Sequence, residues 1–165
     1  MPQMTVDGME DFLDELGRIG AKSAGIAKKC AYSGAAVMAD AVRVWTKALP
    51  LDSNGHFVKG TDPLRVITDQ DREDLAACVG VSGIESDGMT TTVSVSFDGY
   101  ITRAEKKFPN GVPAAMIARS IESGSSVRAK RPFVRPAVRA ASKEVLAAMR
   151  QTMGECIEQI QKLEE

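Results

Sequence analysis

The sequence predicts an α+β fold in which long N-terminal and C-terminal helices pack against a small antiparallel sheet. Two stretches carry apolar residues at helical spacing: one ends before Pro50, and the other runs over about 136–163. Between them, Thr92–Phe97 reads TVSVSF, the strict alternation of a half-buried strand. With 165 residues, of which 44% are hydrophobic, the chain suits one domain, 1–165, that can bury a core.

The N-terminal part predicts two helices. Asp7-Gly-Met-Glu10 resembles a capping box with Asp in place of Ser or Thr, and a short helix is expected over about 8–18. Its apolar residues are Met9, Phe12, Leu13, Leu16 and Ile19. Gly17 and Gly20 are expected to loosen the chain that follows. A second, longer stripe from Ile26 to Trp45 should end before Pro50.

The middle of the chain predicts a long loop and then a hairpin. No periodic pattern is present over about 50–71, where the single histidine, His56, has no Cys or His nearby and is not expected to bind metal or to catalyse. Val79, Val81 and Ile84 then precede a Ser86-Asp-Gly88 turn and the Thr92–Phe97 strand. A lone hairpin is only marginally stable, so it should pack on the helices or join strands from 4–6 or from a neighbouring chain.

The last third predicts two helices joined by an anchored linker. After a turn at Pro109-Asn-Gly111, a helix should begin at Pro113 and end at Gly124. Ser125–Arg131 is expected to run extended, and Pro136 should begin a final helix over about 136–163, roughly 40 Å long. Phe133 stands between two prolines, and we expect the flanking helices to bury it as an anchor.

Composition excludes several classes of protein. The net charge is −1, no apolar run approaches the roughly 20 residues that a bilayer requires, and the N-terminus does not resemble a signal peptide, so a cytosolic origin is the default expectation. The three cysteines, Cys30, Cys78 and Cys156, are too scattered for a zinc site or a disulfide framework. We expect buried, inert thiols, although Lys28-Lys29 beside Cys30 could lower its pKa. No cofactor, metal or catalytic constellation is expected, and the chain is not expected to be an enzyme.

A cluster of cations around Phe133 leaves two hypotheses open. No acid lies between Glu122 and Glu144, while five cations do: Arg128, Lys130, Arg131, Arg135 and Arg139. They could form a phosphate track for nucleic acid. Alternatively, they form a solvated or interfacial strip that pairs with acids of a neighbouring subunit, such as Asp69, Asp71, Glu73 and Asp74. The second hypothesis is favoured because the cations are not interleaved with aromatic residues and no groove-reading motif is present.

Several motifs resemble a known family. In chain order they are Phe97-Asp-Gly-Tyr100, Lys107-Phe-Pro-Asn-Gly111, Ile117-Ala-Arg119, Ile121-Glu-Ser-Gly-Ser125 and Arg131-Pro-Phe-Val-Arg-Pro-Ala137. Together they resemble the signature of the tail-completion or head–tail joining proteins of the tailed-phage neck. The segment Gly8–Leu16 is also similar to the family's opening helix, and the last two motifs are the most specific. The chain departs from the family in its longer insert before Arg72 and in Ser125, where Thr is usual.

The resemblance implies a structural virion protein of α+β fold. Such a subunit would form a homo-oligomeric ring, a hexamer by analogy, that completes or terminates the tail and joins it to the head connector. Its partners would be copies of itself, the tail tube protein and the head connector or adaptor proteins, with DNA at most passing through the lumen. The protein would be made in the host cytoplasm and reside in the neck of the virion. The expected interface and structural residues are Phe108, Arg119, Glu122, Gly124, Arg128, Lys130, Arg131, Pro132, Phe133, Arg135 and Pro136.

Overall fold

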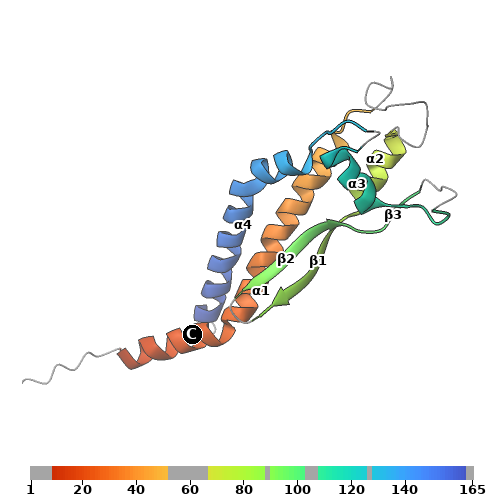
Figure 1. Ribbon diagram of the computed structural model, residues 1–165. Coiled ribbons are helices and arrows are strands. Elements are labelled where there is room, and N and C mark those ends of the chain that lie inside the picture. The colour runs from red at the N-terminus through yellow and green to blue at the C-terminus, as the bar shows by residue number, and fades with distance from the viewer. Residues whose placement is uncertain (1–8, 52–66, 88–89, 103–107, 126–127, 163–165) are drawn as a thin grey trace, which may run out of the picture.

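The computed structural model describes residues 9–51, 67–87, 90–102, 108–125 and 128–162, and it confirms the α+β class. In these residues the chain forms four helices and two antiparallel two-stranded sheets. The long helix α1 (Met9–Lys47) packs against the long helix α4 (Val134–Lys162), and the hairpin lies along another side of α1 (Figure 1). The two predicted long helices are therefore the frame of the molecule.

Helix α1 is continuous, so the prediction of two helices with a loosened segment at Gly17 and Gly20 was wrong. A glycine inside a helix costs roughly 1 kcal/mol relative to alanine, which lowers helix stability without forbidding the helix. Further along, α1 buries Ala39, Val42 and Thr46, and the Thr46 hydroxyl donates to the Val42 carbonyl at 2.7 Å. Asp7, the first residue of the expected capping box, lies outside the described residues.

The expected loop over about 50–71 ends earlier than predicted, because helix α2 (Asp69–Ala77) begins within it. Thr68 is the N-cap: its hydroxyl accepts from the Asp71 amide at 3.2 Å, and the Asp71 carboxylate accepts from the Thr68 amide at 2.9 Å. This capping box has Asp where Glu or Gln is usual, so the pattern did not predict a helix start. Residues 52–66, including His56, lie outside the described part of the chain.

The predicted hairpin is confirmed. Strands β1 (Val79–Ser86) and β2 (Thr91–Phe97) are antiparallel, with Val81 opposite Val95 and an irregularity between Val81 and Ile84. The apolar face of the hairpin packs on α1 and α4 through a cluster that includes Val79, Ala39, Val42 and Ala137. Gly88 of the turn and the strand considered over 4–6 lie outside the described residues.

The second sheet is small and was not expected. It pairs β3 (Tyr100–Ile101) with β4 (Val112–Pro113), so the strands form two sheets rather than one. Pro113 is consequently the last residue of a strand and the N-cap of α3 (Ala114–Ser123), not its first residue. Helix α3 ends before Gly124, as predicted.

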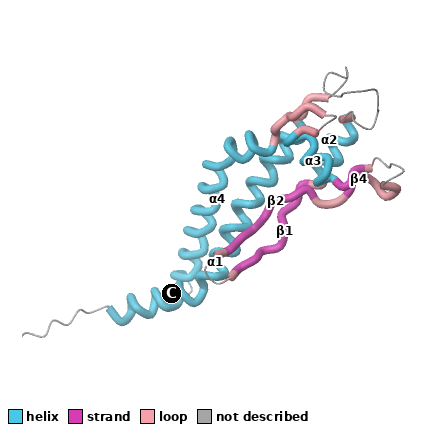
Figure 2. The backbone as a smooth tube through the Cα atoms, in the orientation of Figure 1, coloured by secondary structure: helices cyan, strands magenta, loops and turns pink. Residues whose placement is uncertain are grey.

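Most of the core lies at one end of the α1–α4 pair. Figure 2 shows α2, α3, β4 and several loops gathered there. The buried side chains of this cluster are Leu49, Ile67, Leu75, Ile101, Val112, Ala114, Ala118, Ile121 and Phe133. Helix α4 begins there at Val134, two residues earlier than the predicted start at Pro136, because Pro136 is the third residue of its first turn. This end of the molecule therefore carries the residues of the predicted site.

Candidate functional site

Most of the predicted site residues lie in or beside the connection between α3 and α4, which we call the strap (residues 125–133, of which 125 and 128–133 are described). Gly124, the C-cap of α3, directly precedes the strap, and its φ of 76° and ψ of 173° suit glycine. A Cβ at this position would also lie 3.0 Å from the Lys130 amide nitrogen. Gly124 therefore provides both the turn out of α3 and the space for the returning strap.

The strap folds back along α3 rather than running extended as predicted. The Ser125 amide donates to the Arg128 carbonyl at 2.9 Å, and the Arg128 amide donates back at 3.4 Å. Three residues later, the Arg131 amide donates to the Ile121 carbonyl of α3 at 2.8 Å. These bonds hold the strap against the last turn of α3.

Glu122 of α3 caps the N-terminus of α4. Its Oε2 accepts from the amides of Phe133 (2.7 Å) and Val134 (2.9 Å), and its Oε1 accepts from the amide of Arg135 (3.3 Å). The next residue is Pro136, which has no amide hydrogen. The Ala137 amide then makes the first bond within the helix, to the Phe133 carbonyl at 3.2 Å.

The four amide positions that a helix start leaves without a partner are thus all accounted for by one carboxylate and one proline. The negative charge of Glu122 also lies at the positive end of the α4 dipole. Because the carboxylate occupies this helix end, no amide there is left to bind an external phosphate. The role of Glu122 was not predicted from the sequence, although α4 lacks a Ser, Thr, Asp or Asn at its N-cap, which indicates that a cap must come from elsewhere.

Phe133 is buried as predicted, with 2% of its surface exposed. Its ring meets that of Phe97 edge-on, with centroids 5.9 Å apart and an interplanar angle of 68°. It belongs to the same core cluster as Ile121 of α3 and Leu75 of α2. Phe133 therefore fixes the start of α4 to the core directly beside the Glu122 cap.

Three arginines of the cationic cluster bond within the chain. An Arg128 guanidinium nitrogen donates to the Ser120 hydroxyl at 2.6 Å, and Arg131 donates to the Pro50 carbonyl at 3.0 Å. The Nε of Arg135 lies 3.7 Å from Glu122, although the Arg135 side chain is 71% exposed. Lys130 and Arg139 are exposed, as is Arg119 on α3. The cluster therefore serves first to fasten the strap, and only part of it faces solvent.

The acids considered as partners for these cations are engaged within their own chain. Asp69 pairs with Arg72 at 2.6 Å, Glu73 pairs with Lys47 at 3.3 Å, and Asp71 completes the α2 cap. Asp74 accepts from the Thr102 amide at 2.7 Å. Burial acts to raise the pKa of Asp74, but hydrogen bonds from Thr102 and Gln70 outweigh it and hold that pKa below its ordinary value.

The other expected motif residues have structural positions. Phe108 is partly buried against the main core cluster, and its carbonyl accepts from the Gly111 amide at 3.1 Å. Pro132 is exposed on the strap, next to Phe133. The structure thus brings Glu122, Gly124 and the strap together as one unit, while Phe108 packs against the same core cluster from outside the strap and Arg119 is exposed without a described partner.

The metal-binding and thiol groups of the described residues can be examined directly. No cluster of His, Cys, Asp or Glu among them could hold a metal ion. Cys30 and Cys156 are buried free thiols, as predicted, whereas Cys78 is only partly buried. Burial, with a smaller contribution from Cys156, raises the pKa of Cys30, so the neighbouring lysines do not activate it. None of the helices in the described part of the chain has the length and apolar character needed to cross a membrane.

Comparison of the chain with protein-family models, with curated proteins and with solved structures gave no match.

Proposed function

We propose that this chain is a structural protein of a tailed-phage particle that forms a ring at the head–tail junction, completing or terminating the tail and joining it to the head connector. The proposal starts from the ordered motifs of the sequence, which resemble those of tail-completion and head–tail joining proteins.

One observation carries the proposal: the two most specific motifs are joined in space. Glu122 of Ile121-Glu-Ser-Gly-Ser125 caps the helix that begins within Arg131-Pro-Phe-Val-Arg-Pro-Ala137. Gly124 makes room for Lys130, and Phe133 enters the core. These two motifs of the resemblance therefore form one interdependent structural unit, and this supports interpreting them together.

Nucleic-acid binding by the cationic cluster is the weaker alternative. Arg128 and Arg131 donate to groups of their own chain, and Glu122 occupies the start of α4. A phosphate track would need these donors to face solvent. Titration with duplex DNA over a range of salt concentrations should therefore show no binding. Binding that weakens steeply as the salt concentration rises would favour the nucleic-acid hypothesis.

Deletion of the coding sequence from the genetic element that encodes this chain tests the proposed function. We expect DNA-filled heads and tails to accumulate separately, and expression of the chain from a plasmid should restore joined particles. Particles of normal yield and morphology after deletion would refute the proposal. A block before DNA packaging, with only empty heads, would also contradict a role in the neck.

A further inference from the structure

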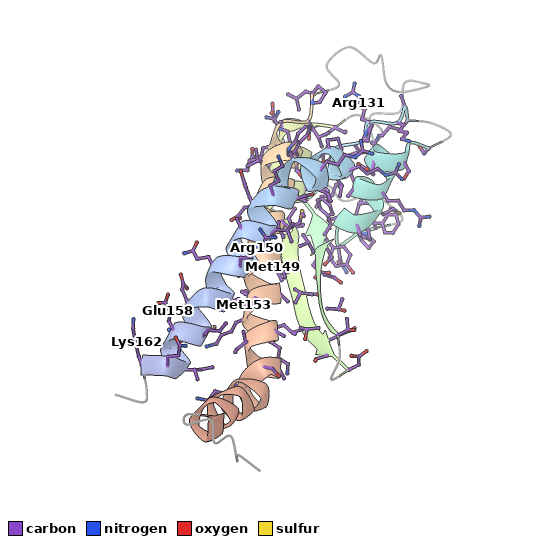
Figure 3. The ribbon with its side chains drawn as sticks, turned by 90° about the vertical axis from the view of Figure 1, so that its left-hand side faces the viewer. Arg131, Met149, Arg150, Met153, Glu158 and Lys162 are labelled. Atoms are coloured by element: carbon purple, nitrogen blue, oxygen red, sulfur yellow. The ribbon has the colours of Figure 1, made fainter. Side chains whose placement is uncertain are left out.

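Helix α4 carries a row of exposed cations and apolar side chains along one side. The row consists of Arg139, Lys143, Leu146, Arg150 and Met153, which follow one another at spacings of four, three, four and three residues and therefore share one side of the helix. Leu146 is 52% exposed and Met153 is 51% exposed. We call this row the basic stripe. Figure 3 shows Arg150 and Met153 along the middle of α4.

The cations of the basic stripe are not neutralised within the described part of the chain. Arg139, Lys143 and Arg150 are exposed, and none of them forms a hydrogen bond or ion pair with a described residue. Met153 also lines an apolar groove with Met149, Ala27 of α1 and Thr91 of β2. The basic stripe thus combines unpaired positive charge with an apolar surface that continues from Met153 into the neighbouring groove.

A different surface lies on another side of α4, where it meets α1. There Ala140 and Glu144 of α4 line a cleft with Asp40, Val44 and Trp45 of α1. We call these five residues the acidic cleft. Val44 is 66% exposed and Trp45 is 38% exposed, which is unusual for apolar side chains of that size. Asp40 pairs with Arg43 at 2.5 Å, whereas Glu144 has no hydrogen-bond or ion-pair partner among the described residues.

The two surfaces complement each other but cannot meet within one molecule. At about 100° per residue, Glu144 lies roughly two fifths of a turn around α4 from the middle of the basic stripe, so both surfaces belong to the same helix and face different directions. One offers cations around Leu146 and Met153. The other offers the unpaired carboxylate of Glu144 beside Val44 and Trp45, with Asp40 already shared with Arg43. Opposite charges around apolar centres are the arrangement that guides specific protein association.

We infer that the basic stripe of one chain docks into the acidic cleft of a second copy of this chain. Such a contact joins two different surfaces, so each bound copy leaves one surface of each kind open for the next. Repetition closes into a ring when the rotation between copies divides a full turn, and it otherwise gives a filament. The inference rests on the proposed function where it concerns the ring, but the pairing of surfaces does not depend on where the ring is used.

Two single variants test the pairing: Leu146→Glu places an anion in the basic stripe, and Val44→Lys places a cation in the acidic cleft. Both side chains are more than half exposed, so each variant should fold, which urea denaturation checks. In sedimentation velocity, wild type should self-associate, and each variant alone should do so at least about tenfold more weakly. Met116→Glu and Ile84→Lys, at residues 45% and 39% exposed but outside both surfaces, should match wild type.

Mixing the two variants separates this arrangement from a symmetric one. Leu146→Glu keeps its acidic cleft and Val44→Lys keeps its basic stripe, so an equimolar mixture should form a one-to-one dimer more tightly than either variant associates alone. The inference is overturned if wild type stays monomeric at the highest attainable concentration, if both variants assemble like wild type, or if mixing restores nothing. If the pairing of surfaces fails this test, the proposed function still stands, because the deletion phenotype tests it separately. If the deletion phenotype contradicts the proposed function, the pairing of surfaces still stands on the association measurements.

Discussion

The carboxylate of Glu122 should make a large contribution to stability for a single side chain near the surface. Glu122→Ala removes the acceptor for three amides at the start of α4, those of Phe133, Val134 and Arg135. The Glu122 side chain is only 15% exposed, so water replaces it poorly at the first two amides. Loss of a helix cap costs about 0.5–2 kcal/mol, and a buried donor without a partner costs about 1–3 kcal/mol. We therefore expect a loss of about 2–4 kcal/mol.

Glu122→Gln should be milder. The amide oxygen of Gln can still accept from Phe133 and Val134, while its NH₂ group would face the more exposed Arg135 amide. The lost charge–dipole interaction is worth about 0.3–1 kcal/mol, and one hydrogen bond is lost with it. The expected loss of unfolding free energy is about 1–2 kcal/mol, so the stability of Glu122→Gln should lie between that of wild type and that of Glu122→Ala.

Urea denaturation followed by circular dichroism measures these differences from the transition midpoint and slope. Glu158→Ala is the matched control, because this glutamate on α4 is 68% exposed and makes only a 4.0 Å pair with Lys162, labelled with it in Figure 3. It should change the free energy of unfolding by less than about 0.5 kcal/mol. If Glu122→Ala is no more destabilising than this control, the cap does not stabilise α4 and the reasoning fails.

Three further predictions concern the same end of the molecule. Phe133→Ala should cost about 3–5 kcal/mol of unfolding free energy, and a loss below 1 kcal/mol would show that its ring is not an anchor. Gly124→Ala should destabilise the protein by about 1–3 kcal/mol, because the φ of Gly124 is 76°. Gly154→Ala is the control, since Gly154 lies in open space on α4, and it should stabilise the protein by roughly 0.5–1 kcal/mol. Equal effects of the two substitutions would contradict the role of Gly124. Because the pKa of Asp74 is lowered in the folded state, its carboxylate contributes stability above about pH 4, and this stability is lost as the pH falls through the folded-state pKa. Asp74→Asn should therefore lose less unfolding free energy on acidification than wild type. An unchanged dependence of stability on pH would count against this role of Asp74.

The sequence predicts those elements whose stability is encoded locally. The alternation of Val93, Val95 and Phe97 predicted β2, and Gly124 predicted the end of α3, because both signals act within a few residues. Pro136 marked the first turn of α4 but not its first residue, since proline is tolerated at any position of that turn where the amide needs no partner.

The remaining features depend on contacts between distant residues. Continuity of α1 through Gly17 and Gly20 was not predicted from local propensity, which tertiary packing often overrides. The pairing of Tyr100 with Pro113 joins strands too short to have a pattern of their own. Glu122 reaches its amides across eleven to thirteen residues, a separation that no local capping rule covers.

The candidate site was predicted as a set of residues, but its physical role was not. Phe133 was correctly expected to be buried, because it is a large apolar side chain held between two rigid prolines. The arginines were expected to face a partner, yet Arg128 and Arg131 bond to Ser120 and Pro50 of their own chain. Charge alone does not reveal whether a cation fastens its own backbone or meets a neighbour. Whether the strap also forms an interface stays a prediction.

Imaging of intact particles by electron cryomicroscopy is the most direct test of the proposed function. Particles purified from the genetic element that encodes this chain should show it as a closed ring of several identical copies between the head connector and the tail tube. A fusion tag on the chain, visible as extra density, would mark its position. Finding the chain once per particle, away from the neck, or absent from complete particles would contradict the account.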